Sequence, residues 1–458
     1  MTKIIRTMRK TIYLSRLLVV VIFIGLESQT LVAQNDTVKV WDLNQCLSYA
    51  IMHNIQVNKK ELSVQSSKVD YLKTRSERLP TLSASLYESL TNSKDISAGA
   101  NDKWSIKRAT SASLSSSLTI YDGGSIANRI MQGSLDIKIA NLDVEIIKNS
   151  IILSITQAYL NVLYAKESVD YAKDVVGTSQ KQVEWAKQLI KVGSIAKTDQ
   201  AQLEAQLASD QYSLVLAQNT LTSNTTSLKQ LLEIPVTENF NVKFPEIDFV
   251  TEYSLLPSIN DAFSTSLSVM PEITSSELNR DAAEIGVKVA QSGYLPNLSL
   301  NANYSTDYSG PSINTFNSQL NNNQMQRVSL SLNIPIFNRN ITRTSVQQSK
   351  INLALANLSM QETKKNLLQN VESVYQNTIA GKSRYDAALV QFSSANESYN
   401  ISEEQFNLGM LNSVDMLKAK NTLLNARKEL IQSKYSAILS RKILDFYMGK
   451  SISLNDKK

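Results

Sequence analysis

The sequence has few of the residues on which most enzymes and metalloproteins depend. Its 458 residues include one cysteine, Cys46, and one histidine, His53. A single cysteine excludes an intrachain disulfide. A single histidine excludes metal sites built from several imidazoles and catalytic arrangements that need two of them. We therefore expect structural roles for both residues, and neither a metal nor a cofactor.

Motifs for nucleotide or nucleophile chemistry are also missing. The sequence contains no glycine-rich phosphate loop and no serine-centred elbow. Acidic pairs such as Glu403-Glu404 are explained by a solvated helix face. We therefore do not expect an enzyme.

Glycine and proline are scarce, with 13 and 8 in the whole chain. Because both residues interrupt helices, their scarcity favours long helices over an all-β fold with many turns. The hydrophobic content of 42% is enough to bury substantial cores. The expected fold class is mainly α with a small β part.

The N-terminus has the pattern of a secretory signal peptide. Basic residues up to Arg16 precede an apolar run from Leu17 to Leu26, and Ala33 supplies a small residue before the expected cleavage site. An uncleaved anchor is the alternative, but the run is shorter than the roughly 20 residues that span a bilayer. Cleavage would lower the net charge from +6 to about +2, so no nucleic-acid partner is indicated.

The second half of the chain repeats the first at a constant offset of 216 residues. Leu79-Pro80 recurs as Leu295-Pro296, and Gly193 recurs as Gly409. A period this long indicates a duplicated domain rather than a solenoid of short repeats. The predicted organisation is a signal peptide at 1–33, a first repeat at 40–233, a linker at 234–258, a second repeat at 259–449 and a tail at 450–458.

Each repeat contains two segments in which apolar residues alternate with serine, threonine or asparagine, as in β-strands. The strands of a soluble sandwich alternate in the same way. Long strands in a secreted, otherwise helical chain favour instead the apolar-out pattern of a membrane barrel. The residues predicted to face lipid are Leu82, Leu86, Leu118, Ile120, Leu298, Leu300, Leu330, Leu332 and Ile334.

A very long segment with few helix breakers follows each strand pair. Residues 125–191 contain no proline, and at about 1.5 Å per residue they would form a helix roughly 100 Å long. A return helix follows the turn at Gly193, with leucines at intervals of seven such as Leu207 and Leu214. An ordinary helical bundle and a wall of antiparallel helices both fit this spacing.

Four strands in one chain cannot close a membrane barrel, because lipid-exposed edges would leave backbone groups unpaired. The smallest bacterial barrels have about eight strands, so the chain must oligomerise. A dimer would supply eight strands, whose interior is filled by side chains, whereas the twelve strands of a trimer leave an open lumen. The hydrophilic strand face suits such a lumen.

These features, in this order, resemble the outer-membrane efflux protein family, the TolC-like channels, over nearly the whole mature chain. The resemblance rests on the strand-to-helix turn at Tyr121-Asp122-Gly123-Gly124, the Val-Gly-Ser and Leu-Gly-Met helix tips, and the tandem duplication. It implies a long antiparallel α-helical barrel that continues a transmembrane β-barrel, with four strands per chain and twelve per trimer.

The resemblance also implies partners and a function. It predicts a homotrimer in outer-membrane lipid that meets a periplasmic adaptor protein and an inner-membrane pump of the RND, ABC or MFS class. The expected function is that of a passive exit duct for efflux or type I secretion. The helix tips that would dock on the adaptor are Gly193-Ser194 and Gly409-Met410.

The resemblance places the pore constriction near Asp199 and Asp415. Identical carboxylates around a three-fold axis form a ring of negative charge that favours cations. Well-studied members carry a second acidic residue three positions after the one that matches Asp415, but this chain has Lys418 there. A simpler role for Asp199 is a favourable interaction with the dipole of its helix.

A secreted helical scaffold or adhesin without a channel is the alternative function. Its strands would form a small water-soluble sheet. Such a protein would be extracted without detergent, whereas a channel would partition into the outer membrane.

Overall fold

The computed structural model describes residues 40–95, 103–235, 237–245, 256–310, 312 and 314–454. The predicted signal peptide lies outside these residues, as do parts of the predicted linker and tail. The chain divides into two compact units. The described residues of the smaller unit are Val40 and Asn239–Asn241, and the larger unit comprises Trp41–Glu238 and Val242–Lys458.

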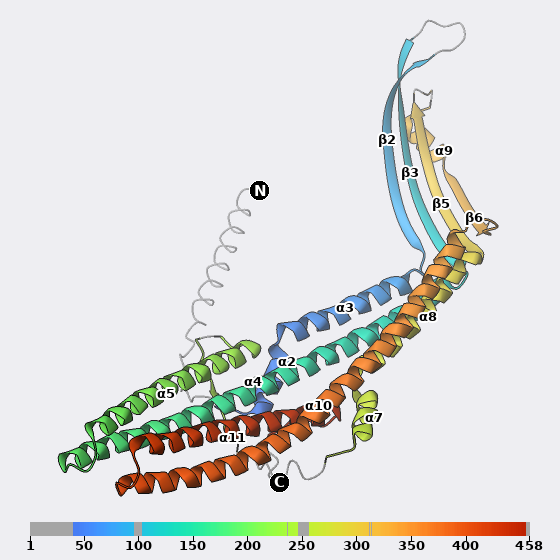
Figure 1. Cartoon of the computed structure of the whole chain (residues 1–458). Helices are drawn as coiled ribbons and strands as arrows, with labels where there is room; N and C mark the ends of the chain where they lie inside the picture. The colour runs from blue at the N-terminus through green and yellow to red at the C-terminus, as the bar shows by residue number, and fades with distance from the viewer. Residues whose placement is uncertain are drawn as a thin grey trace, which may run out of the picture. The chain divides into compact units, whose positions relative to one another are not determined.

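The larger unit is mainly helical, as the composition predicts (Figure 1). Its helices are α2 (Leu43–His53), α3 (Ile55–Ser76), α4 (Ser125–Lys191), α5 (Lys197–Leu231), α7 (Ile259–Val269), α8 (Pro271–Gln291), α9 (Phe316–Asn322), α10 (Ile341–Asn407) and α11 (Ser413–Tyr447), with a 3-10 helix at Ser292–Tyr294. Its main strands are β2 (Thr81–Asp95), β3 (Lys103–Asp122), β5 (Asn297–Gly310) and β6 (Met325–Asn333). Two short strands, β1 (Val40–Trp41) and β4 (Asn241–Val242), pair with each other.

The helices confirm the tandem duplication, because they recur at the offset read from the sequence. The long helices α4 and α10 each have 67 residues, and the return helices α5 and α11 each have 35. The short helices α2 and α7 have 11 residues each. The order of short helices, hairpin, long helix and return helix therefore occurs twice, and these helices, unlike the strands, have matching lengths.

The turn between each hairpin and its long helix has the same backbone in both repeats. Gly123 and Gly124 have φ of +69° and +83°, and their equivalents Arg339 and Asn340 have φ of +54° and +64°. A Cβ at Gly123 would lie 2.7 Å from the carbonyl oxygen of Ser292, so this position requires glycine. In the second repeat Arg339 and Asn340 adopt the same left-handed turn although both have side chains. This conformation costs roughly 1–2 kcal/mol of free energy per residue.

The four long strands form one antiparallel sheet in the order β2-β3-β5-β6. Within the first hairpin Thr81 lies opposite Ser117. Between the hairpins Leu118 lies opposite Leu300, which in turn lies opposite Leu330. These three leucines form one row across the sheet, so they share a face as predicted.

Two of the predicted lipid-facing residues depart from simple alternation. The pairing of β3 with β5 shifts between Thr119 and Tyr121, so Ile120 lies at a bulge, and Tyr121 takes the place opposite Leu298. Ile334 follows the last residue of β6 and therefore lies just outside the strand. The next residue is Pro335, which has no N–H to donate to a strand partner.

The helices form a layer in which neighbours are antiparallel or stacked end to end (Figure 1). Helix α4 packs on α3, α5, α8 and α11, and α10 packs on α7, α8 and α11. Near the turns that join the long and return helices, Val183, Leu203, Phe406 and Met416 belong to one buried cluster. The first repeat therefore packs against the second mainly through its long helix α4, which contacts α8 and α11.

Candidate functional site

The predicted tips are turns that join each long helix to its return helix. Gly193 and Gly409 have φ of +75° and +76°, the left-handed conformation with which many helices end. The N–H of Ser194 donates to the carbonyl of Leu189 at 2.9 Å, and an equivalent bond closes the second turn. Several apolar side chains at the two turns are more than two-thirds exposed, namely Val192, Leu408 and Met410.

The structure gives the two predicted constriction residues different surroundings. The Asp199 carboxylate accepts a hydrogen bond from the N–H of Ala196 at 3.2 Å and from the hydroxyl of Ser413 at 2.5 Å. It therefore connects the first helical hairpin to the second. The exposed Asp415 is held locally, because its N–H donates to Asn412 at 2.9 Å and the amide of Asn412 donates to its carboxylate at 2.8 Å. Asp199 thus contacts the second helical hairpin, whereas Asp415 bonds within its own helix start.

A buried ion pair links the hairpins at a place that sequence reasoning missed. Lys420 of α11 lies 3.1 Å from the carboxylate of Asp210 on α5, and their side chains are only 3% and 4% exposed. Lys420 also lies 2.5 Å from the hydroxyl of Ser179 on α4, which donates to Asp210. The equivalents of Ser179 and Asp210 in the second repeat are Ala395 and Ala426. This difference between the repeats is the signal that would have revealed the cluster.

Three further polar contacts join the same hairpins. The amide of Gln182 on α4 donates to the hydroxyl of Tyr399 at 2.6 Å and to the carboxylate of Glu403 at 2.9 Å, both on α10. Burial, with a contribution from Glu403, raises the pKa of the Tyr399 hydroxyl above its ordinary value. Further along, Lys434 of α11 lies 2.9 Å from Glu167 of α4. The hairpins are thus held together by named polar contacts as well as by apolar packing.

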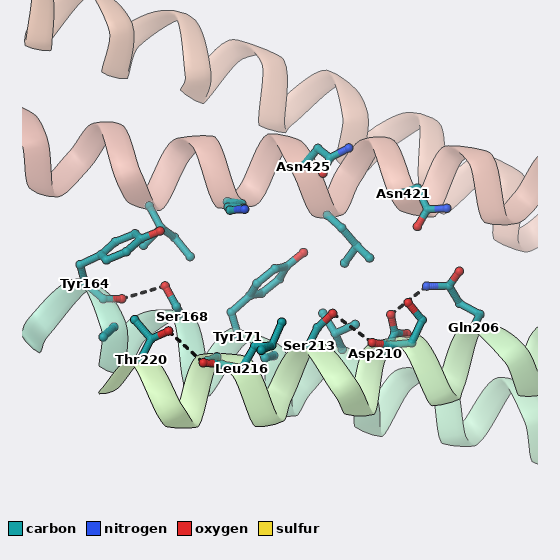
Figure 2. Close-up of a pocket in the computed structure, with 18 residues that line it drawn as sticks. Tyr164, Ser168, Tyr171, Gln206, Asp210, Ser213, Leu216, Thr220, Asn421 and Asn425 are labelled. Carbon is teal, nitrogen blue, oxygen red and sulfur yellow. Dashed lines mark hydrogen bonds between the residues drawn. The ribbon is translucent and has the colours of Figure 1, made fainter. Parts of the chain in front are cut away.

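A cleft of about 580 Å³ separates α11 from α4 and α5 (Figure 2). Asn421 and Asn425 reach in from α11, opposite Tyr171 and Asp210. Burial raises the pKa of Tyr171 to about 12, so its hydroxyl stays neutral near pH 7. The lining combines hydroxyl, amide and apolar groups with the charged side chains of Asp210 and Lys428, a mixture that suits contacts with another chain or with solvent.

Within the part of the chain that the structure describes, the apolar face of the sheet is uncovered. Leu82, Leu86 and Leu330 are 73%, 78% and 62% exposed, although all lie in regular strands. The opposite face carries hydroxyl groups, and the hydroxyls of Ser83 and Ser115 lie 2.9 Å apart. An uncovered apolar surface of this extent indicates an interaction with lipid or protein.

The described residues contain no group of three or more histidine, cysteine, aspartate or glutamate side chains able to hold a metal ion. Cys46 is buried in α2. Burial, with a smaller effect from Asp42, raises the pKa of its thiol to about 12, so it is a structural residue rather than a reactive one.

A family model described as outer membrane efflux protein matches residues 46–233 and 262–450, one match in each repeat. The chain belongs to this family. The outer membrane protein TolC of Escherichia coli (strain K12) is 25% identical over 408 residues, which cover 87% of this chain and 80% of that protein.

Solved structures show the same fold. The structure of CusC matches with a TM-score of 0.78 at 17% identity, covering 89% of this chain and 92% of the other. The Campylobacter jejuni CmeC outer membrane channel matches with a TM-score of 0.74 at 20% identity, covering 90% and 87%.

As an outer membrane efflux protein, this chain is an outer-membrane channel of the class that serves efflux or type I secretion. Its strands belong in the outer membrane and its long helices in the periplasm. Membership of the family replaces the secreted scaffold considered from the sequence alone.

Proposed function

We propose that three copies of this chain close one twelve-stranded barrel and form the passive exit duct between an inner-membrane pump and the outside. The observation that carries the proposal is a single-layer sheet. Among the described residues, one apolar face is uncovered and both edge strands lack a partner on their outer side. A lipid bilayer accepts such a sheet only when the edges are paired and the barrel is closed. TolC-like channels are trimeric, which supports three copies.

In this trimer the apolar face of the sheet contacts outer-membrane lipid, through the residues predicted from alternation. Leu118, Leu300 and Leu330 lie in one row on that face, and Leu298 and Leu332 lie opposite each other in the next. The serine-rich and asparagine-rich face lines a water-filled lumen.

The helix tips dock on the periplasmic adaptor, which connects the channel to an RND, ABC or MFS pump. The turns at Gly193-Ser194 and Gly409-Met410 support this role, because each is a rigid helix end that carries exposed apolar side chains. Apolar anchors that protrude into a partner's pocket supply most of the energy in many interfaces.

The constriction lies at the same end of the helices. Asp415 is the stronger candidate for a ring of carboxylates, because it is exposed and its oxygens contact only the neighbouring Asn412. Asp199 contributes through its contact with Ser413, which ties the first turn of α5 to the start of α11.

The oligomeric state of the detergent-extracted outer-membrane fraction tests the proposed function. We expect native mass spectrometry to give a trimer, and we expect the gel mobility of the unheated sample to change on heating. A monomer recovered from the soluble periplasm would contradict the channel and favour the helical scaffold.

A further inference from the structure

Both outer strands of the sheet lack a partner on one side among the residues with a described structure. β2 and β6 stand at the two ends of the order β2-β3-β5-β6, and all three pairings between them are antiparallel. Strand direction alternates across the sheet, so β2 and β6 run in opposite directions. The β6 strand of one copy can therefore continue the antiparallel pattern by pairing with the β2 strand of a second copy.

The duplication extends to the pairing of individual residues. In the first hairpin Thr81 lies opposite Ser117. In the second hairpin Asn297 lies opposite Asn333, and both numbers are higher by the repeat offset of 216. The two hairpins therefore have the same register, residue for residue.

One junction between hairpins is present within the chain, where Ser117 of β3 lies opposite Asn301 of β5. With the offset of 216 residues between the repeats, β6 corresponds to β3, and β5 corresponds to β2. We propose that the seam between copies repeats this junction, with Asn333 of β6 opposite Ser85 of β2 in the next copy. This inference rests on the proposed trimer, and it adds the strand register that closes the barrel.

The proposed register uses the whole of the shorter edge strand. It places Ser329 opposite Ser89 of the next copy and Met325 opposite Ser93, so every residue of β6 finds a partner within β2. A register that ran off the end of β2 would leave backbone groups of β6 unpaired in the membrane, at several kcal/mol each.

The apolar side chains of the two edges meet in this register. Leu332 lies opposite Leu86, and Val328 lies opposite Leu90. All four are more than half exposed within one chain, and directly opposed residues have Cβ atoms about 5 Å apart. The seam thus continues the apolar face of the sheet across the boundary between copies.

Leu330 faces Glu88 in this register, and that carboxylate is already satisfied inside its own chain. Glu88 accepts hydrogen bonds from Arg108 and Thr110 of β3, both at 2.5 Å. The seam therefore does not have to provide a partner for a charge in the wall of the barrel.

A seam slipped by four residues, with Leu332 opposite Leu82, would also match apolar residues. The long helices decide between the two registers. Helices α4 and α10 begin three residues after Asp122 and its equivalent Asn338, and they have equal lengths. A slip of four residues would displace neighbouring strands by about 13 Å along their axes relative to the in-chain junction, and the helices that follow them would no longer meet at one level.

Disulfide cross-linking in intact outer membranes tests the register. A disulfide needs Cα atoms within about 4.4–6.8 Å of each other, a range met by directly opposed residues but not by diagonal ones at roughly 7–8 Å. The predicted pairs are Ser85→Cys with Asn333→Cys and Ser89→Cys with Ser329→Cys. The native Cys46 is buried, with its thiol pKa raised to about 12, so it stays in place.

Control pairs use the same strand face. Ser85→Cys with Ser331→Cys reports a slip of two residues, and Ser85→Cys with Ser329→Cys reports a slip of four. We expect covalent trimers on a non-reducing denaturing gel for the two predicted pairs and monomers for the controls.

A cross-link in a control pair, or none in a predicted pair, would overturn the proposed seam. Native mass spectrometry of the same samples separates this failure from a failure of the proposed function. A trimer with the wrong cross-links rejects only the register, whereas the absence of a trimer rejects both.

Discussion

At the scale of single residues, the least expected feature is a lysine and an aspartate buried where three helices meet. Removing a charge from water is expensive, and a buried ion pair recovers that cost only through good geometry and additional hydrogen bonds. Lys420 and Asp210 have both, because Ser179 contacts each of them. We therefore expect the pair to fix how the two helical hairpins fit together, more than to add net stability.

Loss of one partner of this pair should be strongly destabilising. Lys420→Met leaves the Asp210 carboxylate buried and unpaired, and we expect a cost of about 3–5 kcal/mol. The measurement is the apparent midpoint of thermal unfolding of the detergent-extracted protein, followed by circular dichroism. The matched control is Lys418→Met, two residues away on the same helix and exposed, which should change the midpoint little.

The double variant Lys420→Met with Asp210→Leu removes both charges. Replacing a buried ion pair with apolar residues of similar size is often neutral or stabilising, so the midpoint should recover most of the loss. If the double variant were as unstable as the single one, the cost would come from packing rather than from the unpaired charge.

Asp415 allows a direct test of the constriction. We expect Asp415→Ala to raise single-channel conductance in a planar bilayer and to weaken the preference for cations, because it removes both bulk and negative charge from the aperture. Asp415→Asn keeps the size, so it should weaken the preference for cations with less effect on conductance. Unchanged conductance and ion preference in both variants would remove Asp415 from the pore.

At the scale of helices and strands, close contact between helices depends on small residues at specific places. Gly381 of α10 lies against α11, and a Cβ placed there would be 3.1 Å from the Cα of Ala437. Gly177, at a different place on α4, has open space where a Cβ would lie. The two glycines lie within helices of equal length, but only one of them is required by packing.

Alanine at these two positions should therefore have opposite effects. Gly177→Ala should stabilise the protein by about 0.5–1 kcal/mol through helix propensity. Gly381→Ala should destabilise it. Forcing a side chain into a packed contact costs typically 1–3 kcal/mol, which outweighs the gain in helix propensity. The comparison is again the apparent unfolding midpoint in detergent, and a stabilising Gly381→Ala would mean that α10 and α11 separate easily.

At the scale of the whole molecule, one chain supplies only part of a barrel wall. It provides two hairpins, two long helices and two return helices, whereas a closed barrel needs several copies. A membrane barrel has no free edge, so the stability of the strands depends on assembly.

The mature protein should lack the signal peptide. We expect the intact mass of the protein from outer membranes to correspond to a chain that begins at Gln34, since residues 1–33 have the pattern of a cleaved signal peptide. A mass that includes these residues would support the uncleaved anchor instead.

Much of the fold could be read from local patterns. The offset of the repeats, the strand alternation after Pro80 and the 67-residue helices follow from periodicity and from the positions of glycine and proline. The bulge at Ile120 could not be read in this way, because a bulge depends on the pairing with another strand. The same holds for the contact of Asp199 with Ser413, which folding brings together from 214 positions apart. The partner of Asp415 is local, because Asn412 precedes it by three residues.

The sequence by itself determined the order and duplication of the elements and the extent of the long helices, because these depend on neighbours along the chain and on breakers. Only the tertiary structure decided that Lys420 meets Asp210, that Ser413 meets Asp199, and that β2 and β6 form the edges of the sheet. The physical reason is that such contacts join residues about 200 positions apart. No local preference encodes which side chains will face each other across helices of this length.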